Sequence, residues 1–417
     1  MRVLLIHPPS SFLLSSNTFP PLGLLYLAGA LRRGGHEALV ADMGCGDSLA
    51  GYEPLGAIGI TATTAQLPYL RGIVEQCRQL YPAVPILLGG PHVTCSYNDP
   101  PKWNVEGAGV GECEEVICYA VEVLKFGEWN GLHYSPNYQA NIHRVGLPDR
   151  DAIDLHKYKY TLASQKATTL ITQRGCPYSC HFCSRTVGQG VVRLRTVEAI
   201  EEELRDIQRR GFNAVVFYDD EFNVYHRHAV EVAEVLGKLG MAWRAFIRTN
   251  LFSEAQAEVF SENGCVELCA GVESGSKKIL RMMEKNATPE QNSRARERCA
   301  KHGIRFKAFT MIGLPWEDYA TVEATRQWLL DNRPDDFDIC IFQPYPGTKI
   351  VQHPERYDIE FDLDYLTNPV WHKGTPGEYK TTVRTKALSS DELIRLRDSI
   401  ELEVREELGL AKLGGKV

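Results

Sequence analysis

Three cysteines stand close together in the stretch GCPYSCHFC, where Cys176, Cys180 and Cys183 have the spacing C-x3-C-x2-C. They directly follow a short apolar stretch at residues 169–172, and the segment itself supplies no fourth thiol. Four thiolates complete a tetrahedral zinc site or an ordinary iron–sulfur site, whereas three leave one coordination position open. The motif therefore predicts a metal site at which a small molecule can bind.

A structural zinc ion is the nearest alternative interpretation. His181 could be offered as a fourth ligand, but it lies between two of the cysteines and would have to converge on the same metal as Cys180. Structural zinc sites usually pair C-x2-C units or add distant histidines. A second C-x3-C pair, Cys265 and Cys269, shares one face of an expected strand without further ligands nearby, and we interpret it as buried core.

The N-terminal part alternates short apolar runs with helical patterns. We expect strands at residues 3–6, 38–41, 57–60 and 85–90, and helices at about 22–33, 69–80 and 114–124. Strands that are apolar on both faces need helices on both sides, which indicates a parallel sheet. Because 417 residues exceed the size of a single growing core, at least two domains are expected. We predict a Rossmann-like α/β domain over residues 1–145.

A second alternation begins after a connector near residue 150. Strands are expected at 169–172, 214–218, 245–249, 265–272, 305–312 and 339–344, with helices between them. Six β/α units predict a partial (β/α)6 barrel over residues 146–350, with its chemistry on the loops at the carboxyl ends of the strands. Residues 351–417 are rich in Pro, Gly and aromatics and end in a helical pattern at about 389–408, which predicts a C-terminal α-helical extension.

Charge and hydropathy exclude several classes of partner. The 53 acidic and 46 basic residues give a net charge of -7, which disfavours a nucleic-acid groove or an anionic membrane surface. The apolar runs fall short of the ~20 residues that span a bilayer. Clustered thiols are typical of metal or catalytic sites in a reducing compartment, so we expect a cytoplasmic protein.

The cysteine motif, with Phe182 before its last cysteine, resembles the radical SAM superfamily. The segments PPLGLLYLAGAL, GITATTAQ, LLGGPHVT and GVGE within residues 1–126 resemble the N-terminal cobalamin-binding (B12-binding) domain of one subgroup. The resemblance implies a [4Fe-4S] cluster on the three thiolates, with S-adenosylmethionine (SAM) chelating the fourth iron. It further implies reductive cleavage of SAM to a 5'-deoxyadenosyl radical, a small-molecule substrate, and an electron donor such as flavodoxin, ferredoxin or a dedicated reductase.

The resemblance also implies site residues at later strand ends. For cofactor binding we expect Phe182, Asp219, Glu221, Arg248, Glu273, Ser274, Ile312 and Gly313. Asp219, Asp220 and Glu221 are candidates for the SAM amino group, although a solvated turn is an equal alternative for each. Arg248 can pair a carboxylate bidentately or serve as a salt-bridge partner inside the barrel. We expect Tyr218 and Asp220 to be catalytic, with barrel packing as the alternative for Tyr218.

The reaction itself is less constrained. Between Asp42 and Ala57 only fourteen residues remain, four of them Gly and one Pro, so a full crossover helix is not expected there. The family normally has one. On this ground we expect a reduced domain and a cobalamin-independent radical dehydration or deoxygenation of an aminosugar, as in aminoglycoside biosynthesis. The alternative is a cobalamin-dependent C-methyltransferase, and the sequence leaves cobalamin binding open. A cluster-bearing sensor protein is disfavoured by the full set of SAM-type segments.

Overall fold

The computed structural model describes residues 1–10, 15, 17–96, 103–125, 140–184, 190–363 and 375–411. The described chain forms two compact units. The N-terminal unit comprises Met1–Tyr160 with Ser184, and the C-terminal unit comprises Thr161–Cys183, Gly190–Leu363 and the described residues from 375 onward. None of the described helices is both long and apolar enough to cross a bilayer.

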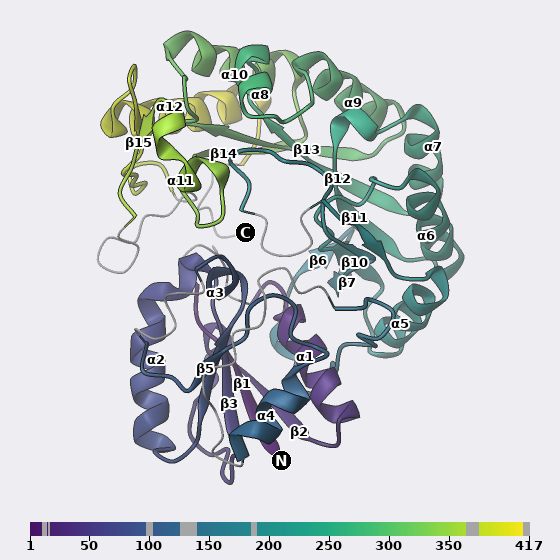
Figure 1. The fold of residues 1–417 in the computed structure, drawn as a ribbon. Helices are drawn as coiled ribbons and strands as arrows, with labels where there is room; N and C mark the ends of the chain where they lie inside the picture. The colour runs from purple at the N-terminus through teal and green to yellow at the C-terminus, as the bar shows by residue number, and fades with distance from the viewer. Residues whose placement is uncertain are drawn as a thin grey trace. The chain divides into compact units, whose positions relative to one another are not determined.

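The N-terminal unit is a five-stranded parallel sheet of order β2-β1-β3-β4-β5. Its strands are β1 (Arg2–His7), β2 (Glu37–Asp42), β3 (Ala57–Thr61), β4 (Ile86–Gly89) and β5 (Gly107–Ala108). Helices α1 (Leu22–Arg33) and α4 (Ile117–Lys125) lie on one face and α2 (Leu67–Leu80) on the other (Figure 1), while α3 (Pro91–Cys95) follows β4. Buried apolar side chains pack on both faces of the sheet, which confirms the predicted Rossmann-like arrangement.

The connection from β2 to β3 contains no full helix, as the sequence predicts. Only a single 3₁₀ turn, Met43–Cys45, follows β2. The fully buried carboxylate of Asp42 organises this connection: it accepts hydrogen bonds from the Gly44 backbone N–H (3.0 Å) and the Tyr158 hydroxyl (2.7 Å), and it lies 3.1 Å from His7 Nδ1. A network of hydrogen bonds thus holds the segment where the family normally has a helix.

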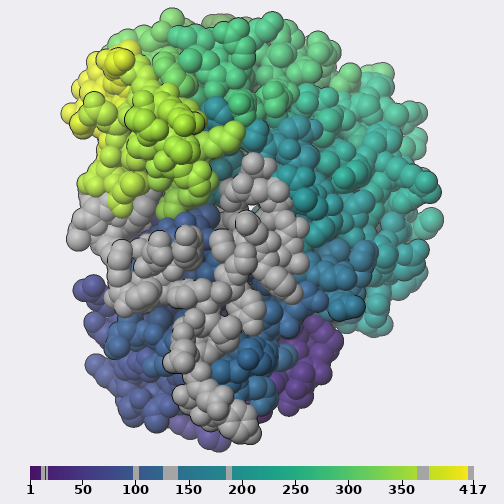
Figure 2. All heavy atoms as spheres, viewed as in Figure 1, coloured from purple at the N-terminus to yellow at the C-terminus, as the bar shows by residue number. Residues whose placement is uncertain are grey.

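The C-terminal unit is a curled seven-stranded sheet of order β14-β13-β12-β11-β10-β7-β6, parallel except for the β6–β7 pair. Helices cover its convex side (Figure 1) and form a continuous outer surface there (Figure 2). This is the predicted partial barrel. The strands are β6 (Thr161–Leu162), β7 (Gln165–Leu170), β10 (Ala214–Phe217), β11 (Ala242–Ile247), β12 (Cys265–Glu273), β13 (Arg305–Ile312) and β14 (Asp336–Ile341). The helices are α5 (Val197–Arg209), α6 (His226–Leu239), α7 (Glu254–Glu262), α8 (Lys277–Met282), α9 (Pro289–Lys301) and α10 (Tyr319–Asn332).

The two faces of this sheet differ in chemistry. Residues of β11, β13 and β14 alternate between buried and half-buried positions, as the period of a strand requires. The buried set is apolar except for Thr310, and Trp243 packs edge to face on Phe217 and Phe260. The half-buried set carries charges in cross-strand pairs, such as Arg244 with Glu267 at 3.1 Å. The less buried face of the sheet therefore combines charged pairs with the stacked rings of Phe246 and Phe309.

The chain after β14 packs back on the edge of the sheet. It contains helices α11 (Lys349–Gln352) and α12 (Ser390–Leu408). Between them, strands β15 (Ile359–Glu360) and β16 (Arg384–Thr385) pair antiparallel in a two-stranded sheet. Ser389 caps α12 in a reciprocal capping box with Glu392. Arg397 and Arg405 on this helix donate to the carbonyls of Ile339 and Phe337 in β14. The predicted terminal helix is confirmed, while residues 364–374 of the predicted extension lie outside the described residues.

A close approach of backbones behind β12 provides a test of this packing. A Cβ added to Gly275 would lie 2.1 Å from the Ala324 carbonyl oxygen. The oxygen belongs to the backbone and the Cβ is bonded to it, so no side-chain rotation can relieve the clash. We expect Gly275→Ala to destabilise the C-terminal unit by about 1–3 kcal/mol. Gly72, exposed within α2, has no atom within 4 Å of the corresponding position, so Gly72→Ala should stabilise the chain by about 0.5–1 kcal/mol. Calorimetric unfolding of both variants checks the opposite signs, and an unchanged transition in Gly275→Ala would contradict the close approach.

Candidate functional site

The three cysteines lie on the loop that follows β7 and the short strand β8 (Gln173–Arg174). Cys180 is buried, Cys176 is half-buried and Cys183 is exposed as a residue. The Cys183 backbone N–H donates to the Cys180 carbonyl (3.1 Å), which folds the second half of the motif into a turn. Burial of the thiol, followed by the neighbouring Cys180 and Cys176, raises the pKa of Cys183 to about 12. The three thiols are close enough to resist joint ionisation unless a cation joins them.

Two of the three acidic residues after β10 hold the start of this loop. Asp219 is buried, and one of its oxygens accepts from the backbone N–H groups of Thr172 (2.6 Å) and Gln173 (3.3 Å), while the other accepts from the Thr172 hydroxyl. Asp220 accepts from the backbone N–H of Gly175 at 3.0 Å, directly before the first cysteine. Burial raises the pKa of Asp219 to about 7 against these hydrogen bonds. The described contacts of both residues therefore position the loop.

Arg248 lies at the end of β11 and reaches the cysteine loop. Its side chain is 1% exposed, its Nη1 lies 3.8 Å from the Cys180 Sγ, and its Cζ lies 3.6 Å from the centroid of the Tyr178 ring. Asn223 fixes the backbone on both sides, accepting from the Arg248 N–H (2.9 Å) and donating to its carbonyl (3.1 Å). Among the described residues, Nε and Nη2 of Arg248 have no hydrogen-bond partner. This cation therefore has buried donors that face no carboxylate.

Glu273 ends β12 in a left-handed backbone conformation with φ of 63°, where the pairing with β13 shifts register. Its carboxylate pairs with the Lys285 ammonium at 2.8 Å, and both side chains are nearly buried. A non-glycine residue in this region is uncommon and stores strain, typically at functional sites. Glu221 lies near the same pair. Burial raises the pKa of Glu221, and the nearby positive charges of Lys285 and Arg248 oppose this rise. Lys285 is a site residue that the sequence reasoning missed.

Ser274 and the following turn are anchored to α10. The buried Ser274 hydroxyl lies 3.2 Å from the Thr325 hydroxyl and accepts from the Ser276 N–H at 3.1 Å. Thr325 also accepts from the Gly275 N–H at 3.0 Å. In the described structure Ser274 thus serves the turn that carries Glu273.

The segment after β13 folds back on its own amides. Ile312 is buried at the strand end, and Gly313 follows with φ of 78°. The buried Glu317 carboxylate accepts from the Leu314 N–H at 3.1 Å, and its second oxygen has no partner among the described residues. Burial raises the pKa of Glu317 to about 8, although the Leu314 and Gly313 amides oppose the shift. Glu317 is a second residue that sequence reasoning missed, although it lies only four residues after the predicted Gly313.

The remaining predicted residues are less constrained. Tyr218 is 44% exposed, and its backbone N–H continues the pairing of β10 with the Leu170 carbonyl at 2.9 Å. Phe182 is half-buried on the cysteine loop. The structure thus brings together the cysteines, Arg248, Glu221, Glu273 and Lys285. Charges within this group influence the pKa values of Cys176, Glu221 and Lys285. The individual roles of the predicted residues stay predictions.

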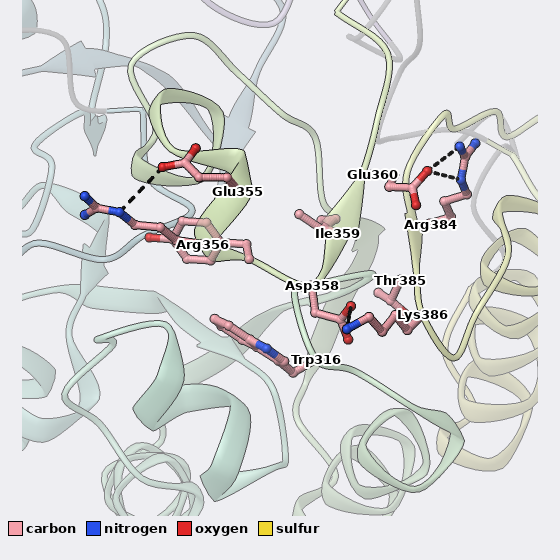
Figure 3. Close-up of a pocket in the computed structure, with 10 residues that line it drawn as sticks. Trp316, Glu355, Arg356, Asp358, Ile359, Glu360, Arg384, Thr385 and Lys386 are labelled. Atoms are coloured by element: carbon pink, nitrogen blue, oxygen red, sulfur yellow. Dashed lines mark hydrogen bonds and ion pairs between the residues drawn. The ribbon is translucent and has the colours of Figure 1, made fainter.

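A separate pocket lies in the C-terminal part of the same unit and has a volume of about 350 Å³. Figure 3 shows Trp316 beneath charged side chains that are largely paired, including Asp358 with Lys386 at 3.4 Å. Tyr357 lines the pocket, and its hydroxyl lies 3.1 Å from Nδ1 of His181. His181 stands between the second and third cysteines in the sequence. The residues of this pocket carry no role in the sequence reasoning.

The residues fit the expected cofactors in two respects. Burial raises the pKa values of Cys176 and Cys183, so these thiols ionise only when a positive charge is close by. The iron of a cluster supplies that charge, because metals bind cysteine as the thiolate. The buried donors of Arg248 fit an anionic group such as the SAM carboxylate or a negatively charged cluster. Within the described residues, no three His, Cys, Asp or Glu side chains surround one point as a single metal ion requires. A four-iron cluster instead takes each thiolate on a different iron.

Comparison with known proteins identifies the domains. A family model for the radical SAM superfamily matches residues 170–329, and one for the B12 binding domain matches residues 14–118. An uncharacterized methyltransferase of Pyrococcus horikoshii is 29% identical over 95% of this chain and 90% of its own. The anaerobic magnesium-protoporphyrin IX monomethyl ester cyclase of Rubrivivax gelatinosus is 26% identical over 84% of this chain and 70% of its own.

A solved structure shares the fold. The radical SAM methyltransferase TsrM from Kitasatospora setae, with cobalamin and a [4Fe-4S] cluster bound, matches with a TM-score of 0.67 and 17% identity, covering 85% of this chain and 75% of that one. The [4Fe-4S] cluster and SAM follow from the radical SAM domain, and cobalamin follows from the B12-binding domain.

The predicted cobalamin-independent dehydration or deoxygenation of an aminosugar is wrong. The B12-binding match spans the short connection on which that prediction rested, and the relatives are methyltransferases and a cyclase. The physical reason is that the short connection does not interrupt the domain: the Asp42 carboxylate bonds the Gly44 N–H and the Tyr158 hydroxyl, and the five strands pair in one sheet. The assignments as a lyase and to natural product biosynthesis fall with it.

The buried Glu317 gives a pH-dependent test of the segment after β13. Its folded-state pKa of about 8 lies above the unfolded value near 4.5, so folding favours the protonated form. Its contribution is fully present below about pH 4.5 and is lost as the pH rises towards 8, by up to about 1.4 kcal/mol per pH unit. Glu317→Gln should flatten the dependence of unfolding free energy on pH across this window. Parallel curves for the two proteins would show that Glu317 ionises freely in the fold.

Proposed function

Because the chain belongs to the radical SAM superfamily, in the subgroup with an N-terminal B12-binding domain, we propose that it is a cobalamin-dependent radical SAM methyltransferase. Its reaction would place a methyl group on an unactivated carbon of a small molecule. The observation that carries the proposal is the B12-binding match within a chain that aligns over nearly its whole length with a methyltransferase relative.

When bound, the cluster and SAM supply a 5'-deoxyadenosyl radical that removes a hydrogen atom, and the corrin supplies the methyl group. We propose that Cys176, Cys180 and Cys183 hold the cluster. Asp219 and Asp220 fix the start of the cysteine loop through its backbone amides. Such fixed geometry keeps reacting groups in place without further ordering at the moment of reaction.

Residues at the other strand ends would bind and orient SAM. Arg248 presents buried donors for the SAM carboxylate, and Glu273 presents a carboxylate for its ammonium or ribose hydroxyls. Lys285 compensates the buried charge of Glu273, so that the carboxylate keeps its place when no ligand is bound. Ile312 and Gly313 would offer backbone and an apolar surface to the adenine, and Phe182 a flat face beside the cluster. Tyr218 and Asp220 would serve proton or electron transfer near the same strand ends, and Glu221 would contact the SAM amino group.

Partners and location remain proposals of the same kind. The radical SAM domain implies an external one-electron donor and a small-molecule substrate, and we propose a flavodoxin- or ferredoxin-type protein as the donor. Because the site needs reduced thiols, we propose that the protein works in the cytoplasm. The boundaries at residues 145 and 350 are likewise kept as proposed domain limits.

The cyclase relative supports a second candidate. It aligns over 84% of this chain and is a cyclase, not a methyltransferase. The two candidates share the cofactors and differ in whether a SAM-derived methyl carbon leaves the protein on a product.

The decisive experiment uses the full chain, reconstituted anaerobically with iron and sulfide and offered hydroxocobalamin. We expect about four irons and one cobalamin per chain after desalting. When a low-potential reductant such as titanium(III) citrate brings the cobalt to the +1 state, the deuterated methyl group of CD3-labelled SAM should pass to the cobalt, with S-adenosylhomocysteine as the leaving product. Replacing all three cysteines of the motif by Ala should abolish iron binding and 5'-deoxyadenosine formation, yet leave cobalamin bound. Mass spectrometry, metal analysis and the cobalamin absorption spectrum supply the readouts.

Two outcomes would contradict the proposal. Cobalamin lost on desalting from a chain that keeps its iron would remove the methyl carrier. Full SAM cleavage with bound cobalamin that never takes up the deuterated methyl group would favour the cyclase.

A further inference from the structure

The buried guanidinium of Arg248 forms no ion pair with a carboxylate of the described residues. Nη1 lies 3.8 Å from the Cys180 Sγ, and the other two nitrogens have no hydrogen-bond partner among the described residues. An uncompensated charge in the interior is costly, because the desolvation of the ion is not repaid by an ion pair. We therefore expect the Arg248 guanidinium to be paired with a negative charge only when a ligand is bound beside it.

We infer that Arg248 is a positioning residue of the cluster that raises its reduction potential. The inference rests on the cluster part of the proposed function. An oxidised four-iron cluster on three thiolates carries one net negative charge and the reduced cluster carries two. A cation beside a ligand sulfur stabilises the reduced state more, and the low dielectric of a buried site strengthens this effect. An N–H donor to the sulfur acts in the same direction.

The surrounding structure holds the guanidinium against the cysteine loop. Tyr178, between the first two cysteines, stacks its ring on the guanidinium at 3.6 Å. Asn223 bonds both the N–H and the carbonyl of Arg248, so the backbone cannot easily shift the side chain away. These contacts hold the cation on the buried cysteine.

The second buried cation nearby is not equivalent. Lys285 forms an ion pair with Glu273 at 2.8 Å, so most of its field at the cluster is cancelled by the adjacent carboxylate. Among the described residues Arg248 forms no such ion pair, and Glu221 influences it only through space, so more of the Arg248 charge acts on the cluster. The two cations thus divide the work: Lys285 compensates Glu273, and Arg248 compensates the cluster.

The step concerned is a single electron transfer. A low-potential one-electron donor, such as a reduced flavin or ferredoxin, is oxidised and the cluster is reduced by one electron, with no bond formed or broken. A higher potential eases this reduction. By the same charge argument, a higher potential makes the reduced cluster a weaker electron donor for SAM cleavage in the state without bound SAM.

The test compares reconstituted wild-type protein with Arg248→Met, which removes the charge and the donor at similar length, and Arg248→Lys, which keeps the charge. Potentiometric titration followed by the electron paramagnetic resonance signal of the reduced cluster, without SAM or cobalamin, gives the midpoint potential. We expect Arg248→Met to shift it to more negative values and Arg248→Lys to shift it less. In protein without cluster, Arg248→Met should raise the unfolding midpoint, because an unpaired buried charge is removed.

Arg397 is the matched control. It is also 1% exposed and lies over a tyrosine ring, at 4.8 Å from the centroid of Tyr379, but it pairs with Asp398 and donates to Ile339. Arg397→Met should lower the unfolding midpoint and leave the cluster potential unchanged. Such a contrast separates an effect on the cluster from a general loss of packing.

An unchanged potential in an iron-replete Arg248→Met protein would overturn the inference. If that variant does not retain its irons, Tyr178 decides the question. Tyr178→Leu, which removes the ring that holds the guanidinium, must then shift the potential negative, whereas Tyr178→Phe must not. Equal potentials in these two variants would also overturn the inference. Because no cobalamin or methyl transfer enters these measurements, failure of the proposed methyltransferase activity leaves their outcome readable.

Discussion

The site depends on a buried carboxylate that joins two strand ends. Asp219, at the end of β10, accepts hydrogen bonds from the backbone and hydroxyl of Thr172 and from the backbone of Gln173, on the loop that leaves β7. The loop that carries the cysteines has few backbone partners of its own, and its first amides must be satisfied once buried. A carboxylate that accepts several of them fixes the direction in which the cysteine segment starts. Asp220 continues this role at Gly175.

The opposite side of the site uses charge in place of backbone hydrogen bonds. Glu273 sits at φ of 63°, a conformation that costs a non-glycine residue on the order of 1–3 kcal/mol, and Lys285 compensates its buried charge. The same strand end also carries a register shift against β13. Strain, an irregular strand and a buried ion pair at one place support the proposal that this carboxylate is held for a ligand.

Much of the architecture follows from local sequence, because it depends on local physics. Helix 22–33 and the parallel strands come from apolar periodicity and from runs that need cover on both faces. The lack of a crossover helix after Asp42 follows from Gly content and length. Lys285, Tyr178 and Glu317 are different: their roles arise from contacts with Glu273, Arg248 and the amides of a turn, which depend on strand order and side-chain direction. No spacing rule marks a lysine twelve residues after a glutamate as its partner.

The same distinction explains why the reaction was predicted wrongly. Composition predicts no full crossover helix in residues 43–56, and this is correct. The step from a missing helix to a missing cofactor assumed that only a helix could complete the domain. The structure fills the gap with the carboxylate of Asp42, which bonds Gly44 in the connection and Tyr158 from a distant segment. Because Tyr158 lies 116 residues further along the chain, no reading of the connection alone could find this support. A domain can therefore lose a crossover helix and keep its sheet when a buried carboxylate joins the shortened connection to a distant segment of the chain.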